Sequence, residues 1–368
     1  MAKTIFNCRN LAVNSVNELE ENGFRIQVYH AENDPISANR VKVSSDLVEL
    51  ELLPSKGFSL AQSWISGQAI FWEAPIALCD TENLDLWSDE IKINGNPAPG
   101  FTFLKTLVAG VELYGLKNWG MPVILDGQLH PLHGETSNIP VDEVQFSVEN
   151  ENTCTIVSSF IYRSFIGNRN LPWYDRGEAL FKVTKKVILT KDSLEFKLED
   201  SIENISDTKQ TPDWGYHITF RPEEGAVLKV PSKRFQERNH NPLPDDFETW
   251  HKAVDKKVRT ETGIVHQELR DESGVTSVLT YPNQTSIAVT VPATPYFQTW
   301  FCNGGKGSKE FTDSHNQSIL EKNWDGMGIE IGSSALDHDG NVNKTVEYDA
   351  MLHQGEKKVV GMKFKLIK

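Results

Sequence analysis

A histidine, an aspartate and two aromatic residues occur together in one short stretch of the chain. Residues 211–220 read Thr-Pro-Asp-Trp-Gly-Tyr-His-Ile-Thr-Phe, which places Asp213, Trp214 and His217 in or beside a strand-like run. A histidine can give or take a proton near neutral pH, and flat aromatic rings suit the C–H face of a sugar ring. The stretch therefore indicates a sugar site, although a histidine in an apolar strand is also common as a satisfied core residue.

Three further polar residues could contribute to the same chemistry. His133 and Glu135 lie in a stretch between Gly115 and Pro140 that is rich in glycine and proline and is predicted to be a loop. Glu330 lies between two isoleucines, so on a strand its side chain points to the face opposite to theirs. A lone carboxylate on that face is either solvated or functional.

The composition is that of a soluble protein with a sizeable core. The chain has 368 residues, of which 39% are hydrophobic and 24% charged, and its net charge is −14. With no block of five or more basic residues, it would be repelled by nucleic acid and by anionic membrane surfaces. A neutral small molecule is the easier ligand.

Two features of the sequence predict the cellular compartment. The N-terminal residues lack the apolar core of a signal peptide, so we expect a cytoplasmic protein. The four cysteines are far apart and form no C-x-x-C pair, which predicts free thiols rather than a zinc site or disulfides.

Short stretches with strand patterns recur along the chain and predict the fold class. The clearest alternation of apolar and charged residues falls in 193–202, and a strand is also expected over 345–349. Helical spacing predicts only three helices, over 15–23, 101–115 and 245–258. No linker or repeat divides the chain, so we expect an all-β protein, one large antiparallel β-sandwich with a few short helices.

Six short motifs occur in a fixed order. They are Pro54-Ser55-Lys56-Gly57, Gly115-Leu116-Lys117-Asn118-Trp119-Gly120, Leu132-His133-Gly134, Tyr216-His217-Ile218-Thr219-Phe220, Pro295-Tyr296-Phe297-Gln298-Thr299-Trp300 and Gly328-Ile329-Glu330. Together they resemble the aldose 1-epimerase, or galactose mutarotase-like, superfamily, in particular a divergent branch of aldose-epimerase-like proteins. The resemblance spans about residues 40 to 360. It implies one galactose mutarotase-like domain over residues 1–368, with residues 1–37 as an N-terminal extension packed on it.

The resemblance also implies a reaction and roles for residues. The protein would be an isomerase that interconverts the anomers of a free sugar without a cofactor, with Glu330 as general base and His217 as general acid. His133 would hydrogen-bond the substrate or the charge that develops on the ring oxygen. Further side chains would hold or stack on the sugar: Lys56, Asn118, Glu135, Asp213, Trp214 and Trp300. For the tryptophans, packing in the core is the alternative.

The sequence departs from the family pattern at two positions. Lys56 stands where an arginine is usual, and Thr219 stands where an asparagine is usual. Both departures bear on the contacts with substrate.

Two other functions remain open at this point. Histidines and carboxylates at 130, 133, 135, 217 and 330 could bind a divalent metal that polarises a keto-sugar for isomerisation, epimerisation or lyase chemistry. Alternatively, the fold could serve as a non-catalytic carbohydrate-binding protein, since fold does not fix function. In each case the partner is a small-molecule sugar, and we expect a monomer or a loose homodimer.

Overall fold

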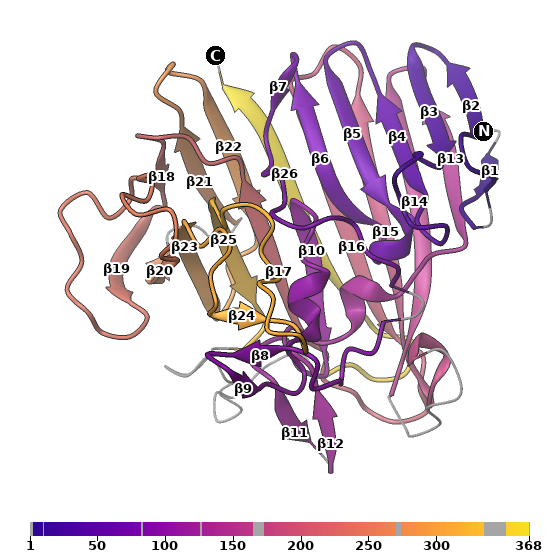
Figure 1. The fold of residues 1–368 in the computed structure, drawn as a ribbon. Coiled ribbons are helices and arrows are strands. Elements are labelled where there is room, and N and C mark those ends of the chain that lie inside the picture. Colours follow the sequence, from indigo (N-terminus) through magenta and orange to yellow (C-terminus); the bar gives the residue numbers. More distant parts are fainter. Residues whose placement is uncertain are drawn as a thin grey trace.

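Two large antiparallel sheets dominate the architecture (Figure 1). The computed structural model describes residues 3–9, 11–81, 84–125, 127–164, 173–269, 274–334 and 351–367. Within these ranges no helix reaches seven residues, which confirms the predicted all-β sandwich with a few short helices. The strand predicted over 345–349 lies outside the described residues.

The first sheet has nine strands, and four of them that are consecutive in the chain also lie side by side in the sheet. In order across the sheet they are β1 (Thr4–Asn7), β13 (Glu143–Glu149), β14 (Thr153–Arg163), β15 (Ala179–Thr190), β16 (Glu195–Asn204), β26 (Lys357–Ile367), β22 (Ser286–Val291), β21 (Val275–Thr280) and β18 (Val227–Lys229). The last strand of the chain, β26, thus lies in the middle of the sheet, between β16 and β22.

The second sheet has twelve strands and carries the candidate catalytic residues. Its order is β19 (Ser232–Glu237), β20 (Thr260–Leu269), β23 (Tyr296–Asn303), β25 (Gly326–Gly332), β17 (Asp213–Phe220), β10 (Val111–Leu116), β6 (Ser59–Ile65), β5 (Val48–Leu53), β4 (Arg40–Ser44), β3 (Phe24–Tyr29) and β2 (Val16–Glu21), with β7 (Gln68–Ala69) paired to β6. Strands far apart in sequence, β23, β25 and β17, therefore become neighbours.

Smaller elements lie beside the twelve-stranded sheet. Two small sheets comprise β8 (Lys92–Ile93), β9 (Asn96–Pro97) and β24 (Phe311–Thr312) in one, and β11 (Val123–Leu125) and β12 (Gln128–His130) in the other. The described helices are all short 3-10 helices: η1 (Pro54–Lys56), η2 (Phe101–Lys105), η3 (Thr136–Asn138) and η4 (Trp173–Asp175).

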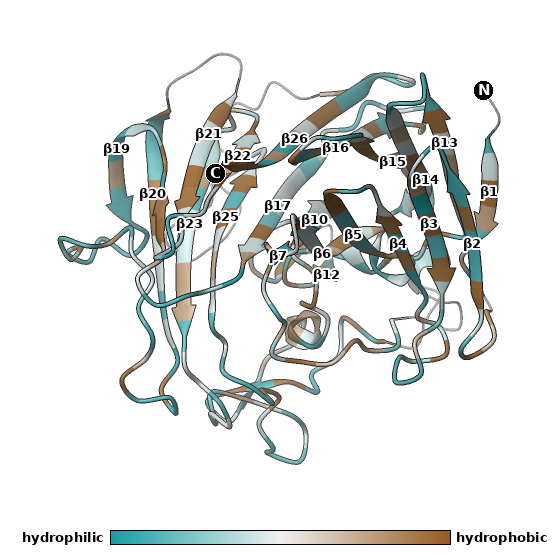
Figure 2. Ribbon diagram, turned by 90° about the horizontal axis from the view of Figure 1, so that it is seen from above, coloured by the Kyte–Doolittle hydropathy of each residue, from teal (hydrophilic) through white to brown (hydrophobic). Residues whose placement is uncertain are grey.

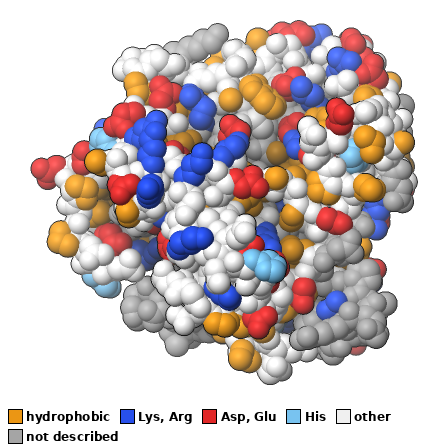
Figure 3. Space-filling view, viewed as in Figure 1, with side chains coloured by type: hydrophobic (Ala, Val, Ile, Leu, Met, Phe, Trp, Pro, Cys, Tyr) orange, Lys and Arg blue, Asp and Glu red, His pale blue; other side chains and the backbone are white. Residues whose placement is uncertain are grey.

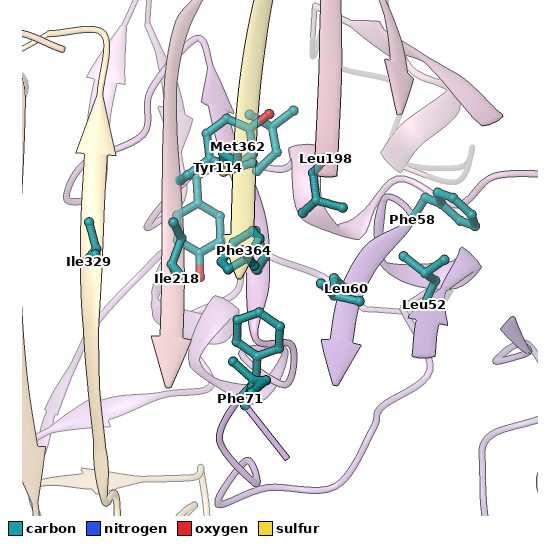
Figure 4. Close-up of a cluster of buried hydrophobic side chains, with 14 of the residues drawn as sticks. Leu52, Phe58, Leu60, Phe71, Tyr114, Leu198, Ile218, Ile329, Met362 and Phe364 are labelled. Carbon is teal, nitrogen blue, oxygen red and sulfur yellow. The ribbon is translucent and has the colours of Figure 1, made fainter. Parts of the chain in front are cut away.

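The core lies between the facing sides of the two large sheets. Figure 2 shows the two layers from above, and buried and more exposed residues alternate along strands such as β3 and β16. Apolar side chains of both layers meet in Figure 4, which labels Leu198, Met362 and Phe364 of the first sheet and Leu52, Leu60, Ile218 and Ile329 of the second. Tyr216 of β17 also reaches across and donates a hydrogen bond from its hydroxyl to Asp200 of β16.

All three predicted helices are wrong, and the sheet explains why. Residues 16–21 and 24–29 form the hairpin of β2 and β3, because β3 buries Phe24, Ile26 and Val28 at the strand period of two. Residues 101–115 divide into the short η2 and the strand β10, which is buried on both faces. A short, mostly apolar segment of this kind satisfies helical and strand patterns alike. The predicted helix over 245–258 is a series of turns.

Residues before 38 supply strands to both large sheets. β1 pairs with β13 at the edge of the nine-stranded sheet, whereas β2 and β3 end the twelve-stranded sheet. The four cysteines are free, as predicted. No helix in the described ranges has the length and hydrophobicity needed to cross a bilayer. The face drawn in Figure 3 carries lysine and arginine side chains beside aspartates and glutamates, so charges of both signs mix there.

Candidate active site

A cavity of about 410 Å³ opens on the side of the twelve-stranded sheet that faces away from the core. This volume is within the range of small-molecule sites, ~300–1,000 Å³. Four of the predicted site residues line it: His133, His217, Trp300 and Glu330. The other lining residues are Ile93, Phe101, Leu104, Leu107, Gly120, Met121, Leu132, Arg238, Asn239, Arg259, Glu261, Phe311 and Trp324.

His217 and Glu330 form the floor of the cavity because their strands are neighbours in register. His217 of β17 is the direct cross-strand partner of Glu330 of β25, so both side chains project from the same face. The His217 Nε2 atom lies 3.3 Å from Oε1 of Glu330. The isoleucines on either side of Glu330 are fully buried in the core, as the alternation in the sequence predicted.

Each member of this pair is held by a further side chain. The Nδ1 atom of His217 lies 2.8 Å from the hydroxyl of Thr219, two residues along the same strand. Gln298 of β23 donates a hydrogen bond from Nε2 to Oε2 of Glu330 over 3.2 Å, and Tyr296 donates to the oxygen of Gln298 over 2.8 Å. Thr219, one of the two departures from the family motif, therefore orients the histidine ring.

Electrostatics keep Glu330 ionised. Burial alone would raise the pKa of this carboxyl, but the hydrogen bond from His217 and the positive charge of Arg238 counteract it. The net effect lowers the pKa of Glu330 below its ordinary value of 4.5. A carboxylate that is ionised near neutral pH and partly open to a cavity can act as a base.

His133 is placed by a tight turn of the backbone. Its φ of 58° lies in the left-handed region, and the following Gly134 has a φ of 70°. The backbone N–H of His133 donates to the carbonyl of Gly120 over 2.9 Å, and its own carbonyl accepts from Gly115 over the same distance. A strained conformation held from both sides is typical of functional positions. It turns the ring toward His217, whose centroid lies 6.4 Å away.

The hydrogen bonding of the His133 ring defines its protonation. Nδ1 lies 2.8 Å from the backbone carbonyl of Trp119, which can only accept, so Nδ1 carries the proton. Burial lowers the pKa of His133 to about 4, and the ring also stacks on Tyr114 with centroids 4.5 Å apart. Near neutral pH His133 is therefore an uncharged imidazole whose Nε2 accepts hydrogen bonds.

Trp300 covers the floor because β25 has a glycine beside it. A Cβ atom at Gly328 would lie 2.7 Å from Nε1 of Trp300 and 2.2 Å from the carbonyl oxygen of Ile218. Only glycine leaves this space, and the indole packs at a centroid distance of 4.8 Å from the His217 ring. The Gly-x-Glu motif thus combines space for an aromatic platform with the carboxylate two residues later.

One wall of the cavity consists of charged residues that the sequence analysis missed. Arg238 and Arg259 flank Glu261, with nitrogen–oxygen distances of 3.1 and 2.6 Å. Arg259 is also paired with Glu310, whereas Arg238 donates one hydrogen bond to Glu261, and its other N–H groups have no partner among the described residues. No sequence pattern could join Arg238 to the other two, since it reaches them only when β19 pairs with β20.

A buried carboxylate positions the segment that carries Arg238. Glu237 is 4% exposed and accepts hydrogen bonds from the backbone and side chain of Asn239, at 2.8 and 3.3 Å. It also accepts from the backbone and side chain of Asn241, at 2.9 and 3.0 Å. These bonds fix the turn after β19, from which Arg238 and Asn239 reach the cavity.

We therefore expect Glu237→Ala to loosen this wall without unfolding the protein. The exposed asparagines regain water, so the loss in free energy of unfolding should be only ~1–2 kcal/mol, while kcat/KM falls roughly tenfold through misplaced Arg238. Thermal unfolding and the kcat/KM for the substrate that the wild-type protein turns over best measure the two effects. Glu268→Ala, at an exposed position of β20, is the matched control. Unchanged kcat/KM in Glu237→Ala would contradict a role for this turn.

The remaining predicted site residues do not line the cavity. Lys56 is fully buried, with Nζ 2.6 Å from Oδ1 of Asn138 and 3.6 Å from Oε2 of Glu112. Glu135 is also buried and accepts a hydrogen bond of 3.0 Å from the hydroxyl of Tyr162. Both residues form contacts within the protein interior rather than with the cavity.

Three more predicted contacts do not line the cavity either. Asn118 donates to the carbonyls of Met121 and Pro131 over 2.9 and 3.3 Å, which joins two loops that flank His133. Asp213 accepts from the hydroxyl of Ser334 over 2.5 Å and lies four strand residues from His217, or ~13 Å. Trp214, 2% exposed, packs in the core.

The residues proposed as metal ligands fall into two separate groups. His130 and Glu135 are neighbours, with Nδ1 and Oε1 3.5 Å apart, and neither lines the cavity that holds His133, His217 and Glu330. Within the described ranges no three histidine, cysteine, aspartate or glutamate side chains are arranged to hold a metal ion. The pattern in the sequence therefore does not become one ligand set.

The architecture is that of a galactose mutarotase-like β-sandwich. A candidate aldose 1-epimerase from Klebsiella pneumoniae is similar over 99% of this chain and 91% of its own, with a TM-score of 0.74 and 16% identity. A galactose mutarotase-like protein from Clostridium acetobutylicum gives 0.53 at 11% identity, over 97% and 99% of the two chains. Galactose 1-epimerase from Lactobacillus acidophilus gives 0.51 at 12% identity, over 94% and 98%. The similarity shows that the chain has the galactose mutarotase-like fold, which the sequence analysis predicted.

The chain belongs to the protein family described as a domain of unknown function, DUF4432, whose model matches residues 36–304. A comparison with curated proteins finds no match.

Proposed function

We propose that this protein is an aldose 1-epimerase that interconverts the anomers of a free sugar. The observation that carries the proposal is the pairing of His217 Nε2 with Glu330 Oε1 at 3.3 Å on the floor of the cavity. Mutarotation needs one group that accepts a proton and one that donates a proton, both within reach of a single carbon. The two groups lie side by side on adjacent strands. An anomeric carbon bound above them would therefore have both groups within reach.

The proton transfers follow from the chemistry of these two groups. The Glu330 carboxylate takes the proton of the anomeric hydroxyl, and His217 in its imidazolium form donates the Nε2 proton to the ring oxygen. The bond from C1 to the ring oxygen breaks, which leaves an open-chain aldehyde, a new hydroxyl on the ring-oxygen side, protonated Glu330 and neutral His217. After rotation about C1–C2, the reverse transfers close the ring on the other face and restore both groups.

The protonation of His133 changes the role that the family resemblance implied for it. An uncharged ring with its proton on Nδ1 cannot donate to the ring oxygen from Nε2. We assign the donor role at the ring oxygen to His217 alone, and His133 accepts a hydrogen bond from a sugar hydroxyl. Trp300 supplies the flat surface on which the sugar ring lies, and Arg238 offers free N–H groups to its hydroxyls.

Anomer exchange measured by NMR tests the proposal. Saturation transfer between α and β anomers is recorded for a panel of free aldoses with wild type, with His217→Ala and without protein. We expect wild type to accelerate exchange for at least one aldose and His217→Ala to lose this acceleration. Exchange at the uncatalysed rate for every aldose, in metal-free and metal-supplemented protein alike, would refute the proposal for that panel.

The pH dependence of kcat/KM offers a separate check. Because the pKa of Glu330 lies below 4.5, its carboxylate is ionised throughout the range above that pH and becomes protonated only as the pH falls below it. His133 gains its proton only near pH 4. We expect the acid limb of kcat/KM to lie below pH 4.5, measured by polarimetry in the range where the protein stays folded. An acid midpoint a full unit or more higher would exclude Glu330 in this environment as the base.

A further inference from the structure

The cavity has two walls of different chemistry. Polar side chains from the β19–β20 end of the sheet form one wall: Arg238, Asn239, Arg259 and Glu261. The wall on the side of η2 and His133 contains side chains that cannot form hydrogen bonds: Phe101, Leu104, Leu107 and Leu132. Most of the second group are aliphatic, which is unusual for a surface that meets a hydroxyl-rich ligand.

The apolar wall lies beside His133, beyond His217. The backbone N–H of Leu132 donates to the carbonyl of Gly100 over 2.9 Å, which joins the loop that carries His133 to the start of η2. Within η2, the Phe103 ring lies 5.3 Å from the His133 ring. Across the sheet the order is β19, β20, β23, β25, β17 and β10, so Glu330 and His217 lie between the polar wall and the apolar wall.

This order orients a pyranose, on the basis of the function proposed above. The anomeric hydroxyl lies at Glu330 of β25 and the ring oxygen at His217 of β17. The direction from Glu330 to His217 leads toward η2. Beyond the ring oxygen in that direction the next ring atom is C5, which carries C6 as its substituent. The substituent on C5 therefore meets the apolar wall, while the hydroxyls on C2 and C3 turn toward Arg238 and Glu261.

We propose that the substrate is a 6-deoxyaldose, whose C6 is a methyl group. A methyl group against Leu104 and Leu107 buries apolar surface, both side chains being under a tenth exposed. The hydroxymethyl group of an ordinary hexose would lose its hydrogen bonds to water there and find no partner on the wall. C4 is bonded to C5, so the hydroxyl on C4 lies near His133. The Nε2 atom of His133 can accept a hydrogen bond from this hydroxyl.

Matched sugar pairs test the proposal. Anomer exchange is measured for D-fucose against D-galactose, L-fucose against L-galactose, 6-deoxy-D-glucose against D-glucose, and L-rhamnose against L-mannose. For the accepted configuration we expect kcat/KM to favour the 6-deoxy sugar roughly tenfold to hundredfold. An equal or higher kcat/KM for the hydroxymethyl sugars would overturn the inference and leave the mutarotase function intact.

Variants of the wall connect the preference to the residues. Leu104→Gln places an amide against C6 and should reduce the preference for the 6-deoxy sugar to less than threefold. Phe101→Gln, at a partly exposed position of the same wall, gives a second readout if Leu104→Gln fails to fold. Ile124→Gln, at a site 71% exposed on β11, is the control and should keep the preference. A preference that survives both lining variants would contradict the assignment.

Binding separates this inference from the proposed reaction. If no aldose shows catalysed exchange, saturation-transfer difference NMR is recorded for the same pairs. Tighter binding of the 6-deoxy member, with its methyl protons the most strongly saturated, would support the ligand assignment although the reaction fails. Absence of binding by any 6-deoxy sugar would overturn it.

Discussion

Replacement of Glu330 by glutamine is expected to slow enzymatic anomer exchange by ~10²–10⁴-fold, the usual contribution of a general base. Glutamine has nearly the same size and can still contact Gln298, so the floor of the cavity keeps its shape. It lacks the negative charge that accepts the proton of the anomeric hydroxyl. Because this proton must leave before C1 can become a carbonyl carbon, the loss falls on kcat more than on KM.

The measurement compares kcat and KM of wild type and Glu330→Gln for the best aldose, by NMR exchange at slow rates and polarimetry at fast ones. Glu199→Gln, an exposed position on β16, is the control and should match wild type. Thermal unfolding of the variant shows whether the fold is kept. A folded Glu330→Gln protein with kcat within tenfold of wild type would show that another group is the base.

The second large effect concerns stability and a residue that the sequence placed in the substrate site. Lys56 and Glu112 are both fully buried, with Nζ and Oε2 3.6 Å apart, and Oε1 of Glu112 accepts from the backbone N–H of Ala109 over 2.9 Å. Burial lowers the pKa of Lys56, and the charge of Glu112 opposes that shift. Lys56→Met would leave the carboxylate without its cation. We expect the free energy of unfolding to fall by ~3–5 kcal/mol.

Chemical denaturation measures this loss. The double variant Lys56→Met with Glu112→Gln removes both charges but retains an oxygen for the backbone N–H groups, and it should recover most of the stability. Lys182→Met, at an exposed position of β15, should change little. A rise in KM with unchanged stability would instead identify Lys56 as a substrate contact.

Alternation along the strands determined the sheets and the direction in which Glu330 points. In β16 charged and apolar residues alternate, and burial follows the same period. Because side chains of a strand alternate between its faces, burying both isoleucines beside Glu330 turned the carboxylate outward. The sequence motifs around His133, His217 and Glu330 therefore identified three residues that line the cavity.

The sequence could not distinguish helix from strand in segments whose conformation depends on the strands that pair with them. The segment of β2 is polar and exposed along most of its length, and it is a strand only because β3 pairs with it. Strand β10 is buried on both faces, so period two leaves no mark on its sequence. Its partners β17 and β6 decide its conformation, and both are distant in the chain.

Tertiary structure alone decided which polar residues share the cavity. Arg238 and Glu261 meet because β19 and β20 pair, and no spacing in the sequence records that contact. Lys56 satisfies a family motif but is enclosed by Glu112 and Asn138. A motif specifies residue types along the chain, whereas access to a ligand depends on what the rest of the fold places in front of each side chain. For that reason the sequence determined the proposed acid–base pair, and the tertiary structure determined the walls around it.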